Sequence, residues 1–340
     1  MEMGGRVVRW VALVGAFFCL ATLNAPKAEA ADKVKFTMDW IITGSHAPFF
    51  SGLDQGHYRG AGVEPAIERG FGGADSIKKL AAGATDFAFA DVGSMVVARS
   101  RGALVKALAV VYDRPQYVFY TIKGAGIRTP KDLEGRTIAN NVGGVVRDLF
   151  PALAAANQVD ESKVKWLIVD AAMIFPALLS GQADLAGSFA VNKPILEAKA
   201  REQGKEIVGI YFGDWGVDIY SNGILTTDDR ITKNPDLVRR FVQASLESIA
   251  WTAENPDAAV ALLVKHHPAV DVKIGRETLR VALESTLTPT IREKGLGYMS
   301  EEKMTRTRDI LTKYMKLPAT VPVKDLYTLD FLPGIKVRAR

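Results

Sequence analysis

Residues 34–40 read Val-Lys-Phe-Thr-Met-Asp-Trp, and after a short loop residues 46–50 read His-Ala-Pro-Phe-Phe. Apolar and polar side chains alternate along the first stretch, which predicts a half-buried β-strand. Pro48 suits the first turn of a helix, where its missing N–H group costs nothing. The sequence therefore predicts a strand that ends at Asp39 and Trp40 beside a helix start, and open α/β sheets bind small ligands at such strand ends.

The side chains in this stretch allow two interpretations. Trp40 could stack on a planar ring, and Asp39 could accept hydrogen bonds from a ring N–H or an amino group. Alternatively, Trp40 is a core residue and Asp39 caps the next turn. The role of His46 also has two interpretations, because a loop histidine can contact a ligand or simply cap the loop.

The first 30 residues predict a secretory signal peptide. Arg6 and Arg9 precede an apolar run over residues 10–23, and Ala-Glu-Ala at residues 28–30 matches a signal-peptidase site. The apolar run is short for a membrane span. We therefore expect a mature chain that begins at Ala31 and resides in the periplasm.

Composition limits what the mature chain can do. The single cysteine, Cys19, lies in the predicted signal peptide, so no disulfide, thiol nucleophile or thiolate metal site is expected afterwards. Removal of residues 1–30 lowers the formal net charge from +5 to +4, because three positive and two negative side chains leave. The positive excess is small and no run of lysine and arginine resembles a nucleic-acid-binding patch, so we expect no nucleic-acid partner.

The remainder of the chain alternates strand-like and helix-like segments, which predicts a mostly parallel sheet in an α/β protein. Beyond Asp228 the pattern is mainly helical. The expected strands cover residues 87–91, 104–111, 117–120, 136–139, 166–169 and 207–212, and the expected helices cover 75–82, 92–100, 129–135, 145–157, 173–180, 234–255, 257–266, 273–286 and 300–315.

One pattern occurs twice. Residues 80–88 read Leu-x-x-Gly-x-x-Asp-x-Ala, and so do residues 178–186. Each copy predicts the end of a helix, a glycine stop and a short strand. Two copies about a hundred residues apart suggest that two similar α/β lobes arose by duplication.

Several predicted strand ends face predicted helix starts that carry glycine. Backbone N–H groups at such starts can bind an anion or a carbonyl group, although glycine there can also serve the turn alone. Together with exposed aromatic and polar side chains they describe a cleft for a small planar ligand. The candidate ligand-binding residues are Asp39, Trp40, His46, Gly72, Gly73, Asp91, Tyr117, Asn141, Gly143, Gly144, Asp170 and Trp215.

Motifs of the common enzyme classes are absent from the sequence. It contains no phosphate-binding G-x-x-x-x-G-K-[ST], no dinucleotide-binding G-x-G-x-x-G and no G-x-S-x-G nucleophile elbow. Its four histidines, His46, His57, His266 and His267, do not have metal-ligand spacing. The sequence therefore predicts no catalytic residue, no cofactor and no metal site.

Four segments carry a family resemblance. They are Asp-Trp followed by H-A-P-F-F-x-G-L-x-x-G-x-Y, then G-F-G-G-A-D-S, A-G-x-T-D-F-A-F-A-D and T-P-K-D-L-E-G-R-T-I-A. Together they resemble the periplasmic substrate-binding proteins of ABC importers, in the branch with thiamine-pyrimidine-precursor, aliphatic sulfonate, taurine and nitrate binders. The likeness extends over residues 33–290.

The resemblance implies a two-lobed periplasmic-binding-protein fold of type II, with a ligand cleft between lobes joined by two crossovers. It implies one lobe of residues 31–115 plus 219–340 and a second of residues 116–218. It also implies a protein that captures a small molecule and delivers it to an ABC transporter permease in the inner membrane, and we expect this protein to be a monomer. Asp39-Trp40 and the segment 214–218 resemble the members that bind pyrimidine rings, and the glycine loops at 72–73 and 141–144 correspond to their ligand loops.

Three alternatives stay open. The ligand could be a sulfonate, taurine or nitrate-type anion, which Arg99, Arg101, Arg114 or Arg147 could counter, although we expect these to be surface or crossover residues. A eukaryotic relative of this fold makes the thiamine pyrimidine and carries a cysteine-rich iron motif, which the expected mature chain lacks. The protein could also present its ligand to a sensory receptor instead of a transporter.

Overall fold

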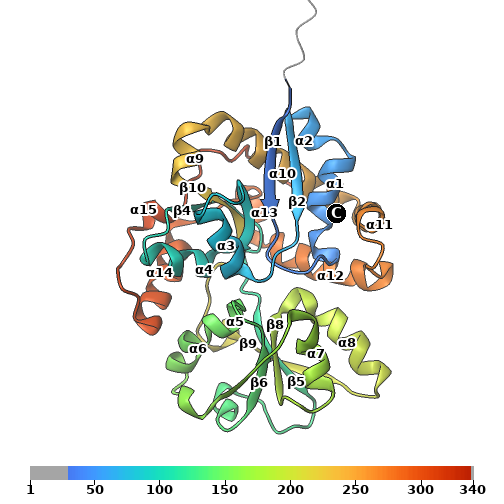
Figure 1. The fold of residues 1–340 in the computed structure, drawn as a ribbon, viewed down its shortest axis with the longest axis vertical. Coiled ribbons are helices and arrows are strands. Elements are labelled where there is room, and N and C mark those ends of the chain that lie inside the picture. The colour runs from blue at the N-terminus through green and yellow to red at the C-terminus, as the bar shows by residue number, and fades with distance from the viewer. Residues whose placement is uncertain (1–29, 338–340) are drawn as a thin grey trace, which may run out of the picture. The chain divides into compact units, whose positions relative to one another are not determined.

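The computed structural model describes residues 30–337. Cys19 and the rest of the expected signal peptide up to residue 29 lie outside this range. Two five-stranded sheets form the framework of the described chain (Figure 1).

The first sheet has the strand order β2-β1-β3-β10-β4. β1 pairs in parallel with β2 and β3, whereas β10 runs antiparallel to both β3 and β4. Its strands are β1 (Asp32–Thr37), β2 (Val63–Glu68), β3 (Phe87–Asp91), β4 (Val105–Val110) and β10 (Asn222–Thr227).

The second sheet repeats this arrangement with the order β7-β6-β8-β5-β9, in which β5 is the antiparallel strand. Its strands are β5 (Tyr117–Ile122), β6 (Thr137–Asn140), β7 (Lys165–Ile168), β8 (Leu185–Phe189) and β9 (Ile207–Tyr211). The chain passes between the sheets at residues 111–116 and again at 212–221, which we call the first and second crossover. The α/β class with two sheets is confirmed, and the exact lobe boundaries stay a prediction.

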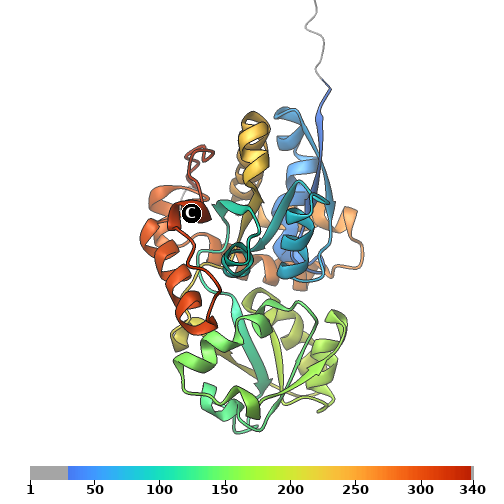
Figure 2. The ribbon, with the colours of Figure 1, turned by 60° about the vertical axis from the view of Figure 1, so that its left-hand side comes forward.

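Helices surround both sheets. Around the first sheet and the C-terminal part they are α1 (Ala47–Asp54), α2 (His57–Gly60), α3 (Gly73–Ala81), α4 (Val92–Ser100), α9 (Asp228–Lys233), α10 (Pro235–Glu254), α11 (Pro256–His266), α12 (Val272–Thr286), α13 (Pro289–Lys294), α14 (Glu301–Met315) and α15 (Val323–Leu326). Around the second sheet they are α5 (Val145–Asp148), α6 (Phe150–Ala156), α7 (Ile174–Leu179) and α8 (Lys193–Glu202). Figure 2 shows α14 extending beside both sheets, where it packs on α4 and α6.

The core of the first sheet depends on aromatic packing across the strand–helix boundary. Phe87 of β3 stacks on Phe241 of α10 with ring centres 3.8 Å apart, and Phe36 of β1 meets the same ring edge-on at 5.0 Å. All three side chains are fully buried. Such contacts fasten the long helix α10 over strands β1 and β3.

Three expected segments differ from the structure. The strand from residue 34 ends at Thr37, because pairing with β2 stops after the Met38 N–H group bonds to the Glu68 carbonyl. The helix expected over 145–157 divides into α5 and α6, since Pro151 has no N–H group to continue the ladder. The segment 129–135 forms only a short 3-10 helix, Pro130–Leu133.

The repeated sequence pattern has the same structure in both copies. Oδ2 of Asp86 accepts the Lys35 N–H group at 2.7 Å, and Oδ2 of Asp184 accepts the Thr137 N–H group at 2.8 Å. Each aspartate therefore fastens the start of its own strand to the neighbouring strand, β1 or β6. This match in position and bonding is the pattern that a duplication would leave.

Asp86→Ala should lower the free energy of unfolding by about 1–3 kcal/mol, because the Lys35 N–H group and the Arg230 guanidinium both lose a carboxylate partner. Urea denaturation measures the change. The matched control is Asp229→Ala, whose exposed ion pair with Lys233 contributes at most about 0.5 kcal/mol. Equal effects of the two substitutions would contradict the role assigned to Asp86.

Candidate functional site

A pocket lies between the two sheets. One wall comes from residues beyond β1 and β2, the end of β3, the first crossover and the start of β10. The other comes from the ends of β6 and β8 and the residues that follow them. The lining residues are Asp39, Trp40, Ser45, His46, Gly72, Gly73, Asp91, Tyr112, Asn140, Asn141, Gly144, Val145, Val146, Gly187, Ser188, Phe189, Val191, Asn192 and Asn222.

Asp39 lies two residues beyond β1 and has a hydrogen-bond partner on each carboxylate oxygen. His46 Nε2 lies 2.9 Å from Oδ1, and the Asn222 side-chain amide donates to Oδ2 at 2.7 Å. His46 Nδ1 accepts the Thr43 N–H group at 3.1 Å, so the neutral ring carries its proton on Nε2 and donates it to Asp39. His46 thus positions Asp39 and also lines the pocket.

Asp91 is the second carboxyl group of the pocket and is fully buried. It caps α4 by accepting the Ser94 N–H group on Oδ1 at 2.6 Å, and its Oδ2 is hydrogen-bonded to the Tyr117 hydroxyl. Burial, and to a smaller degree the nearby charge of Asp39, raises the pKa of Asp91 to about 6 despite these hydrogen bonds. Asp91 can therefore carry a proton under mildly acidic conditions.

The glycine loops approach each other from the two sides of the pocket. Gly72 has a φ of +130°, and a Cβ atom there would lie 2.5 Å from the Gly143 carbonyl oxygen. Close by, the Asn141 side-chain amide donates to the Phe71 carbonyl at 3.1 Å. The glycines thus permit the two loops to touch, which explains why residues so far apart in sequence meet here.

The second wall is rich in amides. Asn140 Oδ1 accepts the Asn141 N–H group at 2.8 Å, and Asn192 donates to Ser188 Oγ at 3.3 Å. The Asn141 Oδ1 atom is buried and has no donor within the described chain. Because a buried acceptor without a partner is costly, this oxygen is suited to receive a hydrogen bond from a ligand.

Eight predicted site residues line the pocket, namely Asp39, Trp40, His46, Gly72, Gly73, Asp91, Asn141 and Gly144. The other four do not. Tyr117 is buried behind Asp91, Gly143 lies one residue from the lining, Asp170 is exposed, and Trp215 packs half-buried against the core near Asn157.

Sequence reasoning missed several lining residues. Tyr112 and Asn222 belong to the first crossover and to the start of β10, for which the sequence has no marked pattern. Asn140 precedes the predicted loop by one residue, a signal that could have been used. Phe189 ends β8 and Asn192 lies three residues beyond it, and only the repeated pattern at 178–186 points towards them.

No lysine or arginine lines this pocket within residues 30–337. Arg99 pairs with Asp228 at 2.6 Å, and Arg147 lies over the Trp166 ring at 5.7 Å. Arg101 and Arg114 are exposed and lie outside the lining. The charged groups at the pocket are thus the carboxyl groups of Asp39 and Asp91, which disfavour an anion.

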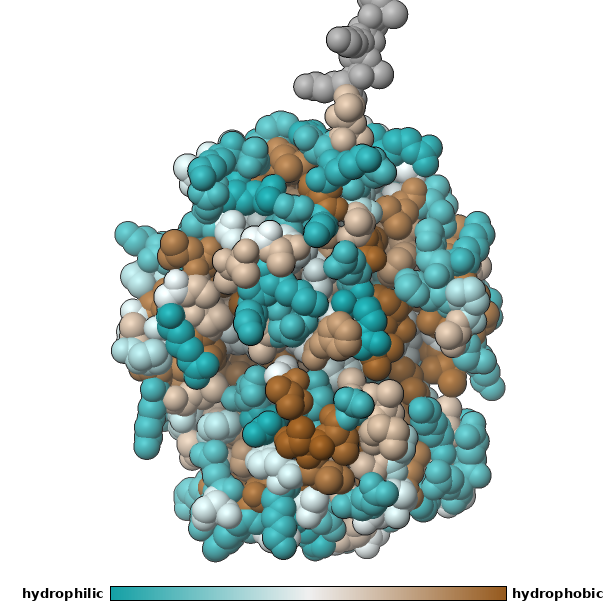
Figure 3. Space-filling model, viewed as in Figure 1, coloured by the Kyte–Doolittle hydropathy of each residue, from teal (hydrophilic) through white to brown (hydrophobic). Residues whose placement is uncertain are grey.

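Several large apolar side chains are exposed in the part of the chain that holds the second sheet. Val142, Ile168 and Met173 are among the large apolar residues that are exposed in the described chain. Figure 3 shows a hydrophobic patch on the part of the molecule that holds the second sheet. Trp40 reaches from the first sheet to pack beside the second-sheet cluster that includes Ile174.

Residues 30–337 contain no group of three or more histidine, cysteine, aspartate or glutamate side chains that could hold a metal ion. None of the described helices combines the length and apolar character needed to span a bilayer.

Comparison with known proteins places these features in context. A family model described as NMT1/THI5 like matches residues 43–259, more than half of the chain. The riboflavin-binding protein RibY of Chloroflexus aurantiacus is 28% identical over 320 residues, covering 91% of this chain and 89% of the relative. The formylaminopyrimidine-binding protein of Halalkalibacterium halodurans is 23% identical over 275 residues, covering 79% of this chain and 82% of the relative.

A relative with an enzyme name also matches. The 4-amino-5-hydroxymethyl-2-methylpyrimidine phosphate synthase of Schizosaccharomyces pombe is 23% identical over 225 residues, covering 63% of this chain and 64% of the relative. Among solved structures, the alkanesulfonate-binding protein SsuA of Xanthomonas axonopodis pv. citri, bound to MOPS, superposes with a TM-score of 0.68 at 14% identity, covering 88% of this chain and 99% of that one. This likeness shows the periplasmic-binding-protein fold.

Gly72→Ala should destabilise the protein more than Gly83→Ala, because the new Cβ would collide with the Gly143 carbonyl oxygen. Gly83 has a φ of +71° and open space around it, so its substitution adds only the backbone strain of about 1 kcal/mol. Urea denaturation gives the two free energies, and small-angle X-ray scattering should show a larger radius of gyration for Gly72→Ala alone. Indistinguishable variants would mean that the loop contact does not hold the two sides together.

Proposed function

This chain belongs to the NMT1/THI5-like family, and we propose that it is a periplasmic solute-binding protein that captures a small, planar, pyrimidine-like heteroaromatic ligand. It delivers the ligand to an ABC transporter permease in the inner membrane. The relatives named for binding riboflavin and formylaminopyrimidine support this role, because they match most of the chain. Both named ligands contain a pyrimidine ring.

The charge of the pocket carries the choice of ligand. Its lining has two carboxyl groups and, within the described chain, no lysine or arginine. A sulfonate or nitrate would experience repulsion from Asp39 without a compensating cation. The likeness to the sulfonate-binding SsuA is one of fold, and the lining favours a neutral or cationic ligand with N–H donors.

Each group in the pocket has a role in this proposal. Trp40 provides an aromatic face for the ring, and Asp39 accepts ring or amino hydrogens, since each carboxylate oxygen can accept more than the single bond it already has. Asn141 Oδ1 accepts a further hydrogen. The loops at 72–73 and 141–144 close over the ligand from both sides.

The competing enzyme function is less well supported. The synthase relative matches 63% of the chain, against 91% for the riboflavin-binding relative. A binding protein should return its ligand unchanged, which mass spectrometry of the released ligand tests directly.

Thermal-shift and calorimetric titration should detect riboflavin or a pyrimidine such as formylaminopyrimidine, and not an alkanesulfonate or nitrate. At a hundred times the dissociation constant, a ligand stabilises the fold by about 2.7 kcal/mol, or several degrees in melting temperature. A response to sulfonates alone would overturn the ligand class while leaving the binding-protein function intact.

Trp40→Ala should weaken binding of the heteroaromatic ligand by about 1–3 kcal/mol, or roughly 5- to 150-fold, through the loss of stacking. Trp215→Ala is the matched control, because this tryptophan lies outside the pocket. Isothermal titration of both variants below their melting temperatures makes the comparison. Similar losses in both would refute the stacking role of Trp40.

Asp39→Asn separates the two ligand classes. For a ligand that donates hydrogens, the loss of a charged acceptor should weaken binding at least tenfold. For an anion, the loss of the carboxylate charge should leave affinity unchanged or raise it. Asp229→Asn, at an exposed position in α9, serves as the control for a general charge effect.

A further inference from the structure

The Tyr117 hydroxyl connects the pocket to the second crossover. It lies within hydrogen-bond distance of Asp91 Oδ2 and 2.9 Å from the Tyr220 carbonyl oxygen. Asp91 ends β3 in the first sheet, Tyr117 begins β5 in the second, and Tyr220 lies in the crossover between β9 and β10. All three residues are buried. One hydroxyl thus joins both sheets and the chain that links them.

This hydroxyl has one hydrogen and two acceptors to satisfy. A carbonyl oxygen can only accept, and an ionised carboxylate can only accept. If Tyr117 donates to Tyr220, the hydrogen between Tyr117 and Asp91 must come from the Asp91 carboxyl group. If Asp91 is ionised, Tyr117 donates to it, and the buried Tyr220 carbonyl loses the donor that it has here.

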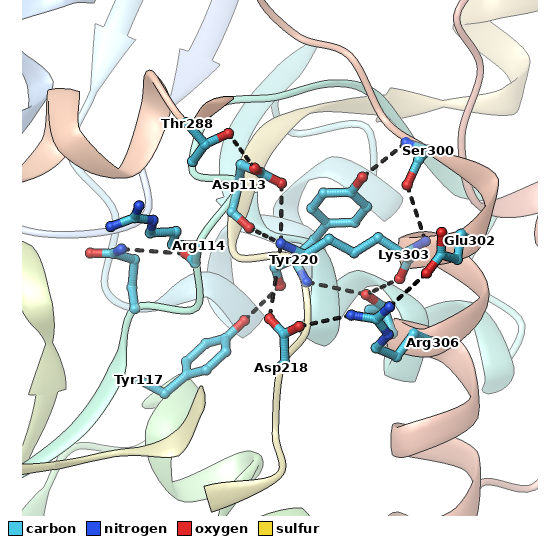
Figure 4. Close-up of polar contacts among 12 residues, drawn as sticks. Asp113, Arg114, Tyr117, Asp218, Tyr220, Thr288, Ser300, Glu302, Lys303 and Arg306 are labelled. Atoms are coloured by element: carbon cyan, nitrogen blue, oxygen red, sulfur yellow. Dashed lines mark hydrogen bonds and ion pairs between the residues drawn. The ribbon is translucent and has the colours of Figure 1, made fainter. Parts of the chain in front are cut away.

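The Tyr220 carbonyl belongs to a crossover that is braced on its other side by α14. Tyr220 donates its N–H group to Thr307 Oγ1 at 3.1 Å, its hydroxyl accepts the Ser300 N–H group at 2.9 Å, and the Lys303 ammonium lies 4.9 Å from its ring centre (Figure 4). A change at the carbonyl therefore acts on a segment that is otherwise held firmly.

Lys303 also reaches the first crossover. Its ammonium group lies 3.1 Å from Asp113 Oδ1 and 4.0 Å from Asp218 Oδ1, and Arg306 pairs with Asp218 at 2.9 Å (Figure 4). Both crossovers are thus fastened to α14 by ion pairs. In contrast to these ion pairs, the hydrogen bond between Tyr117 and Asp91 can reverse, because either group can be the donor.

We propose that a single proton on Asp91 switches the hydrogen bonds between the pocket and the second crossover. With the proton present, Asp91 donates to Tyr117 and Tyr117 holds the Tyr220 carbonyl. Without it, Tyr117 donates to Asp91 and the crossover is released at that point. Because Asp91 lines the pocket, the switch would tie ligand capture to pH, and this part alone rests on the proposed function.

The surroundings of Asp91 are consistent with reversible protonation. Burial raises its pKa to about 6, and the titratable groups that face it are Asp39 from beyond β1 and Tyr117 from β5. The remaining neighbours are uncharged, namely the Ser94 N–H group of α4 and the Ser221 hydroxyl, which faces Tyr117. No lysine or arginine in the described chain forms an ion pair with Asp91 that would hold it ionised.

The sign of the pH effect follows from this raised pKa. The unfolded chain has the ordinary aspartate pKa near 4, so the folded state binds the extra proton between about pH 4 and pH 6. The contribution of Asp91 to stability is fully present below about pH 4, decreases as the pH rises through 6, and stays constant above about pH 7. Asp91→Asn removes this dependence, because its amide can donate to Tyr117 at every pH.

The test is urea unfolding of the ligand-free protein and of Asp91→Asn at several pH values from 4.5 to 7.5. Between pH 4.5 and pH 7.5, the unfolding constant of the wild type divided by that of the variant should rise about 25-fold, with most of the rise complete by pH 6.5. Asp229→Asn should follow the wild type at all pH values. A ratio that does not change with pH would overturn the proposal.

Hydrogen exchange tests whether the effect passes through Tyr117. At pH 7.5, Asp91→Asn should protect the Tyr220 and Ser221 amides better than the wild type does, and at pH 4.5 the two should agree. In a Tyr117→Phe background, Asp91→Asn should bring no such gain. An equal gain in both backgrounds would refute the role of Tyr117.

Wild-type protein alone keeps the test decisive if a variant fails to fold. Protection of residues 212–221, normalised to helix α10, should fall as the pH rises through 6, and constant protection would overturn the proposal. None of these measurements uses a ligand. A failed ligand screen would therefore count against the proposed function and leave the proton switch to be judged separately.

Discussion

The placement of two carboxyl groups at the ends of adjacent strands, Asp91 fully buried and Asp39 partly buried, is the constraint on which the rest of this structure depends. Asp39 lies two residues beyond β1 and Asp91 ends β3, and these strands are neighbours in the first sheet. Both side chains line the pocket. A buried carboxyl group is costly unless donors surround it. Each has one local partner, His46 or the Ser94 N–H group, and one from a distant part of the chain. The distant partners are Asn222 of β10 for Asp39 and Tyr117 of β5 for Asp91. Satisfying these two groups therefore requires both crossovers to be in place, so the pocket and the connections between the sheets are built together.

The two sheets have matching strand orders, but they contribute different side chains to the pocket. Asp86 and Asp184 occupy equivalent places and bond to equivalent backbone groups, which is what repeated folding units share. At the pocket the two sides differ. The first sheet contributes carboxyl groups, whereas the second contributes amides such as Asn140 and Asn141. In the proposed function, a ligand between them would meet strong acceptors on one side and neutral groups on the other, and the positions of its hydrogens would orient it.

The fold of this protein resembles that of a sulfonate-binding protein, but the charge of its pocket does not suit a sulfonate. The superposition on a sulfonate-binding structure reflects how two sheets and two crossovers are arranged. The ligand is decided by a few side chains added to that arrangement, and here they are acidic or neutral. Arg99, which could have countered an anion, is paired with Asp228 at a distance from the lining. Local charge is therefore the better guide to the ligand than overall similarity.

The sequence by itself determined the α/β class, the repeat, the helix starts and most strand ends, because hydrophobic period, proline and glycine act over a few residues. It also marked Asp39, Trp40 and the glycine loops, since they directly follow strands. Only the tertiary structure decided which strand ends face each other, so Asp170 and Trp215 lie elsewhere. It likewise revealed Asn222, which lies 183 positions from Asp39 in the chain and which no local sequence pattern predicts as a pocket residue. Hydrogen-bond partners of buried charges are chosen by folding in three dimensions, and a one-dimensional pattern does not contain that choice.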